Sequence, residues 1–232
     1  MGLESICLFD LDHTLLPLDS DHAWGQYTTR MGWTDAENFA QRNDAFYRQY
    51  QKGELDIYAY VLFATQAARE RGFQASTLAH QAFMRDVIIP AIRPEATALV
   101  QRHRAQGDRL LIVTATNEFV TAPIAQAFGI DTLIAVQLER DRNGELTGRI
   151  AGAPSFGPGK VVRLQQWLDE QGLTWEGIRS TFYSDSITIY PCLKRSTTRW
   201  RPTPMRVCVP WRSSEAGPFW NCSHPHDQKN HR

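Results

Sequence analysis

The chain has 232 residues, of which 42% are hydrophobic and 22% charged, and its formal net charge at pH 7 is zero. This length suits one buried core with an inserted domain, and zero net charge gives no long-range attraction to nucleic acid or to an anionic membrane. No stretch approaches the roughly 20 apolar residues that span a bilayer, the first residues have no basic region of a signal peptide, and the four cysteines show no paired short spacing. We therefore expect a reduced, cytoplasmic protein with no nucleic-acid or membrane partner.

Short apolar runs alternate with helical patterns along most of the chain. Continuous apolar runs predict buried parallel strands at 5–9, 109–113, 133–137 and 180–183. Apolar residues spaced three and four apart predict helices at 95–106, 119–128 and 160–171. Asn143-Gly144, at the centre of residues 138–150, predicts a β-hairpin. The alternation of strands and helices predicts an α/β fold, a Rossmann-like doubly wound parallel sheet.

A long helical block separates the first two predicted strands. Residues from about 21 to 83 show amphipathic helical spacing, with breaks near Gly32, Gly53 and Gly72. We expect this block to form a helical cap domain at 17–89. The catalytic core would then consist of residues 1–16 and 90–186.

Two carboxylates follow the first predicted strand, in Asp10-Leu11-Asp12-His13-Thr14. Ligands of open α/β sheets bind just beyond the C-terminal ends of the strands. One carboxylate of such a pair can attack phosphorus while the other transfers protons. Taken alone, the motif is equally consistent with a turn in which an aspartate caps a loop or a helix.

Three further residues stand at predicted strand ends or helix starts. Thr114 can hydrogen-bond a phosphate oxygen or serve as a helix N-cap. Lys160, which follows residues 156–159 at a helix start, can hold phosphate and offset a nucleophile's charge, or it can be a surface lysine. Asp185 can bind a hard cation or be a turn residue. The occurrence of all the motifs in this order favours phosphoryl transfer.

In these motifs the chain resembles the haloacid dehalogenase superfamily over residues 5–186. It is similar to the phosphoserine-phosphatase-like branch, which has a helical cap after the first motif. The strings D-S-D-H-A-W at 19–24, R-N-D-A-F-Y at 42–47 and T-A-T-N at 114–117 look like those of bacterial histidinol-phosphatase-like members.

The resemblance implies a Mg²⁺-dependent phosphatase for a small phosphorylated metabolite, such as histidinol phosphate or phosphoserine. It implies that Asp10 is the nucleophile that forms an aspartyl-phosphate and that Asp12 is the general acid and base. Thr114 and Lys160 would hold phosphoryl oxygens, while Asp10, the backbone carbonyl of Asp12 and Asp185 would hold Mg²⁺. The metal would offset the repulsion between the carboxylate nucleophile and the phosphate dianion.

Substrate contacts are expected from the cap and from the end of the second strand. The expected residues are Asp19, Asp21, His22, Arg42, Asn43, Ala115 and Thr116. Asp19 and Asp21 can meet a substrate ammonium group, but Ser20 and Asp21 can equally form the N-cap of the first helix. Two other functions stay open: a catalytically impaired phosphate-binding relic, and a phosphotransferase whose acceptor is not water. The sequence indicates no oligomeric state.

The resemblance ends after Ser186, where the family continues with an Asn-Asp pair and an apolar helix. Residues 187–232 contain three of the four cysteines, half of the 12 prolines and three of the seven tryptophans, and they show no helical or strand period. With synonymous codons chosen to fit, one added base after the Ile187 codon converts the tail into an Asn-Asp pair, an amphipathic helix and a final apolar strand. We therefore predict that residues 187–232 are an aberrant, frame-shifted tail.

Restoring that base should raise both the thermal midpoint and the Mg²⁺-dependent phosphatase rate above those of the present chain. The restored helix and strand would cover apolar area of the neighbouring strand, at roughly 25 cal/mol per Å², whereas the prolines of the present tail oppose a continuing helix. Thermal denaturation and phosphatase assays of both versions test this hypothesis. Equal midpoints together with equal rates would refute it, and a tail that forms its own ordered strand on the sheet would count heavily against it.

Overall fold

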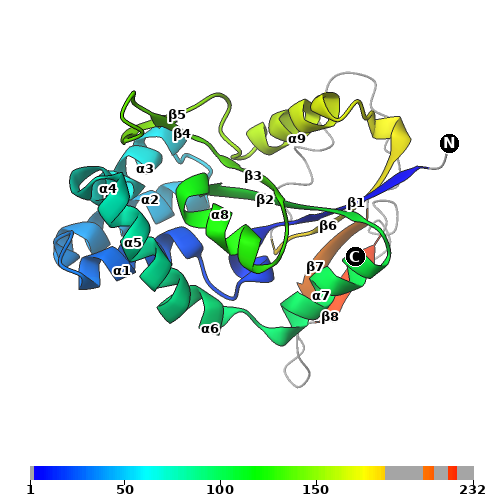
Figure 1. The fold of residues 1–232 in the computed structure, drawn as a ribbon, viewed down its shortest axis with the longest axis horizontal. Helices are drawn as coiled ribbons and strands as arrows, with labels where there is room; N and C mark the ends of the chain where they lie inside the picture. The colour runs from blue at the N-terminus through cyan, green and yellow to red at the C-terminus, as the bar shows by residue number, and fades with distance from the viewer. Residues whose placement is uncertain (1–2, 186–205, 212–218, 224–232) are drawn as a thin grey trace.

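The computed structural model describes residues 3–185, 206–211 and 219–223 (Figure 1). The strands are β1 (Glu4–Phe9), β2 (Arg109–Asn117), β3 (Thr132–Val136), β4 (Leu138–Arg140), β5 (Leu146–Ile150), β6 (Ile178–Tyr183), β7 (Arg206–Trp211) and β8 (Phe219–Ser223). The helices are α1 (Ser20–Arg30), α2 (Ala36–Lys52), α3 (Ile57–Ala64), α4 (Gln66–Arg71), α5 (Phe73–Phe83), α6 (Ile89–Ala91), α7 (Pro94–Ala105), α8 (Glu118–Ala127) and α9 (Gly159–Glu170). Short π- and 3-10-helical turns are η1 (Leu11–Leu15), η2 (Met84–Ile88) and η3 (Trp175–Gly177). Within these ranges, no helix has the length and apolar character needed to cross a membrane.

One sheet with the strand order β3-β2-β1-β6-β7-β8 forms the centre of the fold. β1 pairs in parallel with both β2 and β6, and the registers place Phe9 opposite Ile112 and Tyr183. Parallel pairing brings the carboxyl ends of these strands to one edge, where ligands of open α/β sheets bind. The predicted α/β class with a parallel central sheet is confirmed, and β8 runs antiparallel to β7 at the edge.

Alternating side chains of β1 face two separate hydrophobic layers. Ile6 and Leu8 pack in one cluster with Leu168 of α9. Cys7 and Phe9 point to the other face and join a cluster with residues of α7, α8 and the inserted helices. Figure 1 shows α9 on one side of the sheet and α7 and α8 on the other. Because both faces are covered, the strand reads as a continuous apolar run in the sequence.

We call helices α1 to α5 the cap, and Trp24 of α1 packs between α1, α5 and α8. This side chain is only 2% exposed. Its ring lies against the rings of Tyr27, Trp33, His80, Phe83 and Phe119. Phe119 belongs to α8, so this aromatic cluster joins the cap to the core. The domain boundaries at 17–89 and 90–186 stay predictions.

The β4–β5 hairpin contacts the cap from the core side. Glu145 accepts a hydrogen bond from the Phe73 backbone N–H at 2.7 Å. Gly148 has φ +83° and lies so close to the cap that an added Cβ would be 2.7 Å from Leu62 Cδ1 and 2.8 Å from Arg69 Nε. The hairpin therefore fastens α3, α4 and α5 to the core.

Two elements differ from their sequence-based predictions. β2 continues beyond the predicted end at 113, so that Thr114 and Thr116 lie within the strand. Residues 187–232 show no strand period in the sequence, yet β7 and β8 extend the sheet, which counts heavily against the prediction of an aberrant tail. The open edge of a strand offers backbone partners to any extended segment, which a search for side-chain periodicity does not reveal. The frame-shifted origin of the tail stays a prediction, and its other residues lie outside the described ranges.

Gly148→Ala should loosen the hairpin from the cap, whereas Gly144→Ala should not. The two glycines have nearly the same φ, +83° and +82°, so both substitutions strain the backbone similarly. No atom lies within 4 Å of the Cβ position at Gly144. We expect Gly148→Ala to reduce the free energy of unfolding by about 2 kcal/mol more than Gly144→Ala does. Urea denaturation measures both, and equal losses would contradict the close contact at Gly148.

Candidate active site

Three neighbouring strands carry, at or near their carboxyl ends, the residues that the sequence singled out. The Asp10 backbone N–H, just after β1, donates to the Tyr183 carbonyl of β6 at 2.8 Å. Thr114 lies in β2 on one side of β1, and Asp185 follows β6 on the other side. Because the strands are parallel neighbours, side chains from three distant parts of the sequence meet at this edge.

Asp10 is a buried carboxylate with several hydrogen-bond donors, and it is 8% exposed. Its Oδ1 accepts from the Leu11 backbone N–H at 3.0 Å, and its Oδ2 accepts from Lys160 Nζ and Ser184 Oγ, both at 3.2 Å. Lys160 is 7% exposed, so it is not a surface lysine. Such pairing is required because an unpaired buried ion loses its hydration without compensation.

Gly159 determines where Lys160 lies. α9 begins at Gly159, and a Cβ at this position would be only 2.0 Å from the backbone oxygen of Pro154. No carbon atom approaches a non-bonded oxygen so closely, so glycine is needed for the loop to pack against the start of the helix. Lys160 then reaches Asp10 from the first turn of α9, where the helix dipole also favours an anion.

Asp12 connects the first strand end to the cap and to β2. Its Oδ1 accepts the Ser20 backbone N–H at 2.8 Å, and its Oδ2 accepts the Thr116 hydroxyl at 2.8 Å. Thr114 Oγ1 lies 3.5 Å from the same Oδ2 and accepts the Thr116 N–H at 3.1 Å. Burial, and then the charge of Asp19, raises the pKa of Asp12 to about 6. A carboxyl group with this pKa can both hold and release a proton near neutral pH.

The chain turns sharply after Asp12. His13 has φ +55°, in the left-handed region that residues other than glycine adopt uncommonly. Beyond this turn, the Thr14 hydroxyl donates to Asp185 Oδ1 at 3.4 Å and accepts the Asp185 backbone N–H at 3.0 Å. The turn therefore links the first motif to the end of β6.

Asp10, Asp185 and the Asp12 carbonyl make up the predicted cation site. Burial, and then the charge of Asp10, raises the pKa of Asp185, as expected for two carboxylates that share one region. Among the described residues, no three His, Cys, Asp or Glu side chains gather as a metal cluster. Two carboxylates and a carbonyl nevertheless suit Mg²⁺, which takes one or two protein carboxylates and completes its shell with water and substrate phosphate.

Further carboxylates lie at the start of α1. Asp19 Oδ1 accepts the His22 N–H at 2.9 Å, so Asp19 is the N-cap of α1 and the expected alternative with Ser20 as the cap is wrong. Asp21 is 7% exposed and accepts a hydrogen bond from Asn117 Nδ2 at 3.2 Å. Burial, and then the charge of Asp19, raises the pKa of Asp21 to about 7.

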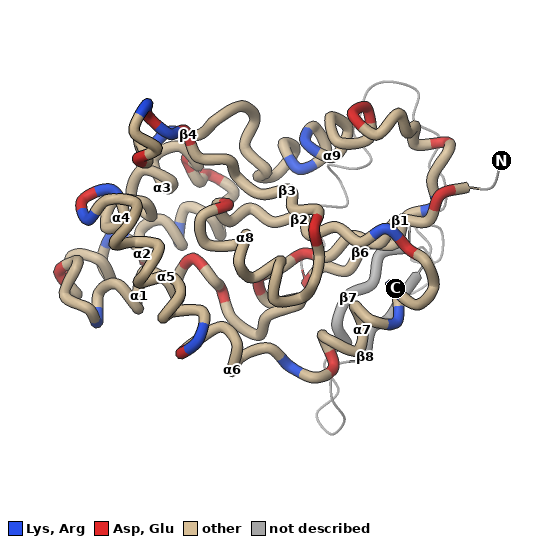
Figure 2. The backbone as a smooth tube through the Cα atoms, viewed as in Figure 1, with Lys and Arg blue, Asp and Glu red and all other residues tan. Residues whose placement is uncertain are grey.

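Asp12, Asp19 and Asp21 therefore form an acidic region between the core and the cap. Asp19 raises the pKa of both other carboxyl groups, and a hydrogen bond from Tyr60 to Asp21 opposes the shift only in part. Figure 2 shows acidic segments near the start of α1, whereas α9 and the tip of the β4–β5 hairpin carry acidic and basic segments together. An acidic region of this kind favours a cationic group of a ligand.

His22 and Asn43 lie together where α1 meets α2. His22 Nδ1 is 2.9 Å from Asn43 Nδ2, and His22 Nε2 is 2.9 Å from Gln26 Nε2. Since the His22 backbone also donates to Asp19, the imidazole is held close to the acidic region. The structure thus groups these two predicted contacts with Asp19.

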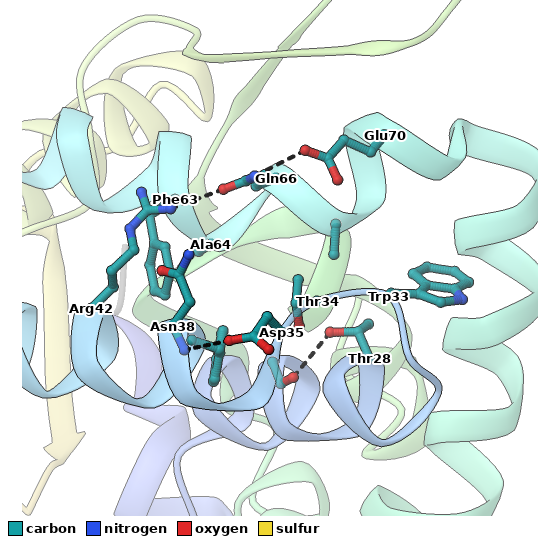
Figure 3. A pocket seen from close by; sticks show the side chains of 13 residues that line it. Thr28, Trp33, Thr34, Asp35, Asn38, Arg42, Phe63, Ala64, Gln66 and Glu70 are labelled. Atoms are coloured by element: carbon teal, nitrogen blue, oxygen red, sulfur yellow. Dashed lines mark hydrogen bonds between the residues drawn. The ribbon is translucent and has the colours of Figure 1, made fainter.

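Arg42 is not grouped with the catalytic residues. It lines a cavity of about 170 Å³ within the cap, between α1, α2, α3 and α4 (Figure 3). Its guanidinium lies 4.6 Å from the centroid of the Phe63 ring and donates to Gln66 Oε1 at 3.0 Å. Neither Asp10 nor Lys160 lines this cavity. The sequence-based assignment of Arg42 to the substrate site therefore has no geometric support.

Four contributors were not predicted as site residues: Ser184, Gly159, Asn117 and Tyr60. The Gly-Pro-Gly string at 157–159 was the one available signal for a close backbone approach. A serine after a strand and a tyrosine within a helix have many other uses, so neither was distinctive. Ala115, which was predicted, lies half-buried in β2 between the two threonines.

These side chains suit an enzyme that transfers a phosphoryl group by way of a carboxylate nucleophile. A buried, lysine-paired carboxylate stands beside a carboxyl group of raised pKa, at the ligand-binding edge of a doubly wound sheet. Residues 7–194 match the family model of the haloacid dehalogenase-like hydrolases. The chain belongs to this family, and it is a phosphatase.

The chain is similar to three proteins over most of its length. The chain is 42% identical over 193 residues to a histidinol-phosphatase of Neisseria meningitidis serogroup C, covering 83% of this chain and 87% of that protein. A protein with unknown function from Bordetella pertussis Tohama I has a crystal structure with a TM-score of 0.77 and 45% identity, covering 83% of this chain and 87% of that one. A substrate-bound phosphoserine phosphatase shares the fold, with a TM-score of 0.54, 16% identity and coverage of 84% and 83%.

Asp21→Asn should stabilise the protein, and more strongly at high pH. The pKa of Asp21 is about 7 in the folded state and about 4 in an unfolded chain. The part of the free energy of unfolding that depends on the protonation of Asp21 is therefore fully present below about pH 4. It is lost as the pH rises through about 7, where the folded protein must bury the charged carboxylate. Asparagine removes that loss, so we expect the thermal midpoint to rise by on the order of 5 °C at pH 8 and by much less at pH 5.

Asp44→Asn is the matched control, because Asp44 is exposed on α2. Its thermal midpoint should differ from that of the unaltered protein by the same small amount at both pH values. A gain for Asp21→Asn that does not change between pH 5 and pH 8 would show that Asp21 is not held in the protonated form.

Proposed function

We infer that the protein is a phosphomonoesterase that hydrolyses histidinol phosphate through an aspartyl-phosphate. The observation that carries this proposal is the buried Asp10 carboxylate, held by Lys160 and Ser184 beside an Asp12 of raised pKa. A nucleophile and a proton-transferring group two residues apart can perform both halves of such a reaction.

In the first half, an Asp10 oxygen attacks phosphorus and the bond from phosphorus to the substrate oxygen breaks. Asp12 gives its proton to the departing alkoxide, so that a neutral alcohol leaves. The pKa of about 6 allows Asp12 to carry this proton near neutral pH, and the Thr116 hydroxyl fixes the carboxyl group. Lys160 and the Thr114 hydroxyl hold phosphoryl oxygens while negative charge builds up.

In the second half, Asp12 takes a proton from water, and the resulting hydroxide attacks phosphorus. The bond between phosphorus and the Asp10 oxygen breaks, which returns the Asp10 carboxylate and releases inorganic phosphate. Asp10, Asp185 and the Asp12 carbonyl would hold Mg²⁺, whose charge offsets the repulsion between the carboxylate and the phosphate dianion.

The acidic region supports an amino-alcohol phosphate as the substrate. Asp19 and Asp21 stand on the cap side of Asp12, so an ammonium group beside the departing alcohol would meet negative charge there. The Neisseria relative, with 42% identity, is named a histidinol-phosphatase. Histidinol phosphate has an ammonium group on the carbon next to the one that bears the phosphate ester, which fits this arrangement.

The test is a substrate panel with Mg²⁺: histidinol phosphate, phosphoserine, and several sugar and nucleotide phosphates. We expect histidinol phosphate to have the highest kcat/KM, because the other substrates lack the ammonium group or add a carboxylate near Asp19 and Asp21. Asp10→Asn should lower kcat by about 10³-fold or more. The variant should still fold, with a lower thermal midpoint, because the buried Lys160 loses its counter-charge.

Asp44→Asn serves again as the control and should keep the full rate. Substantial Mg²⁺-dependent turnover by Asp10→Asn would overturn the aspartyl-phosphate route. Similar rates across unrelated sugar and nucleotide phosphates would overturn the substrate and leave only the reaction class.

A further inference from the structure

Two aromatic side chains meet where the cap approaches the loop that precedes α9. Tyr50 lies in the last turn of α2, and Phe156 lies in the loop that leads to Lys160. Their ring centroids are 6.4 Å apart and the ring planes are inclined at 49°. One ring is therefore supplied by the cap and the other by the core.

Phe156 is the anchored member of this pair. Its side chain is half-buried against a cluster that includes Val61 of the cap and Leu146 of the hairpin. Its backbone carbonyl accepts the Gly159 N–H at 2.9 Å. Since Gly159 precedes Lys160, the position of the Phe156 ring is tied to that of the lysine that holds Asp10.

Tyr50 is the accessible member, with 51% of its surface exposed. Burial, and then the charges of Asp185, Asp10 and Asp19, raise the pKa of its hydroxyl. The same carboxylates that surround the phosphoryl position therefore act on Tyr50. A large ring that stays half-exposed against Phe156, in the loop that leads to Lys160, is available to a bound substrate.

We propose that Tyr50 and Phe156 form an aromatic clamp that binds the planar ring of the substrate's alcohol and selects aromatic over aliphatic phosphate esters. The proposal rests on the proposed function, in which that ring is an imidazole. Aromatic rings associate at centroid distances of 4.5–7 Å in inclined or offset arrangements, and the inclination of the pair lets a third ring lie against the free face of Tyr50. The acidic region then receives the ammonium group while the clamp receives the ring.

The experiment uses three phosphate esters that share the 2-amino-alcohol part and differ in side chain. They are histidinol phosphate and phenylalaninol phosphate, which carry rings, and leucinol phosphate, which does not. Tyr50→Leu and Phe156→Leu should each raise KM for the two ring-bearing esters by about tenfold. KM for leucinol phosphate should change by less than twofold, and kcat should stay unchanged for all three with Tyr50→Leu.

Two further variants separate the ring from other roles of the side chain. Tyr50→Phe keeps the ring and should keep the preference for ring-bearing esters. Tyr58→Leu is the matched control, because Tyr58 is 58% exposed on α3 and stands two residues, about 200° around the helix, from the inward-facing Tyr60. It should leave all three KM values unchanged.

An equal rise in KM for leucinol phosphate, or no rise for the ring-bearing esters with Tyr50→Leu, would overturn the clamp. If Phe156→Leu lowers kcat for every ester, the substitution has displaced Lys160. The KM values of Tyr50→Leu alone then decide whether the clamp exists. If the unaltered protein does not prefer histidinol phosphate over sugar phosphates, the proposed function fails. The clamp is then tested by comparing KM for phenylalaninol phosphate with KM for leucinol phosphate. Calorimetric titration of Asp10→Asn with the same two esters compares their dissociation constants without turnover.

Discussion

A carboxylate that is 8% exposed must have its charge compensated within the protein, and the compensation of Asp10 organises the active site. Lys160 supplies the opposite charge, while the Leu11 N–H and the Ser184 hydroxyl supply hydrogen bonds. These donors come from the start of α9 and from the turns after β1 and β6. A buried ion pair is useful only when both members are held in place. The close approach of the loop at Gly159 is therefore as necessary as the lysine itself.

In the acidic region, unlike at Asp10, the negative charges of neighbouring carboxylates are not compensated by a cationic side chain among the contacts described above. Burial and mutual repulsion raise the pKa of Asp12 and of Asp21, so folding favours their protonated forms. For Asp12 the consequence is chemical, because the carboxyl group can carry the proton that the proposed mechanism gives to the departing alkoxide. For Asp21 the consequence is a loss of stability at high pH, which a cationic ligand can relieve. Such stored repulsion at a functional site is common, because stability and function place different demands on the same residues.

The cap is joined to the core at separate points, and each has a physical consequence for the site. Trp24 packs against Phe119 of α8, which fixes α1 and hence the acidic region. The β4–β5 hairpin presses Gly148 against α3 and α4. On the same side of the cap, Tyr50 of α2 reaches Phe156 in the loop that leads to Lys160. Packing far from the reacting atoms thus determines which part of a substrate the cap can touch.

The sequence by itself determined the residues whose position follows from strand and helix boundaries. Asp10, Thr114 and Asp185 stand at the ends of apolar runs, and parallel pairing brings such ends together whatever the intervening chain does. Contacts that depend on how separately folded segments pack were not readable from one-dimensional spacing. The turning of Arg42 towards Phe63, the β7–β8 extension of the sheet and the meeting of Tyr50 with Phe156 are of this kind. Only the tertiary structure decided them, because side-chain direction and edge pairing depend on distances between elements that no local pattern records.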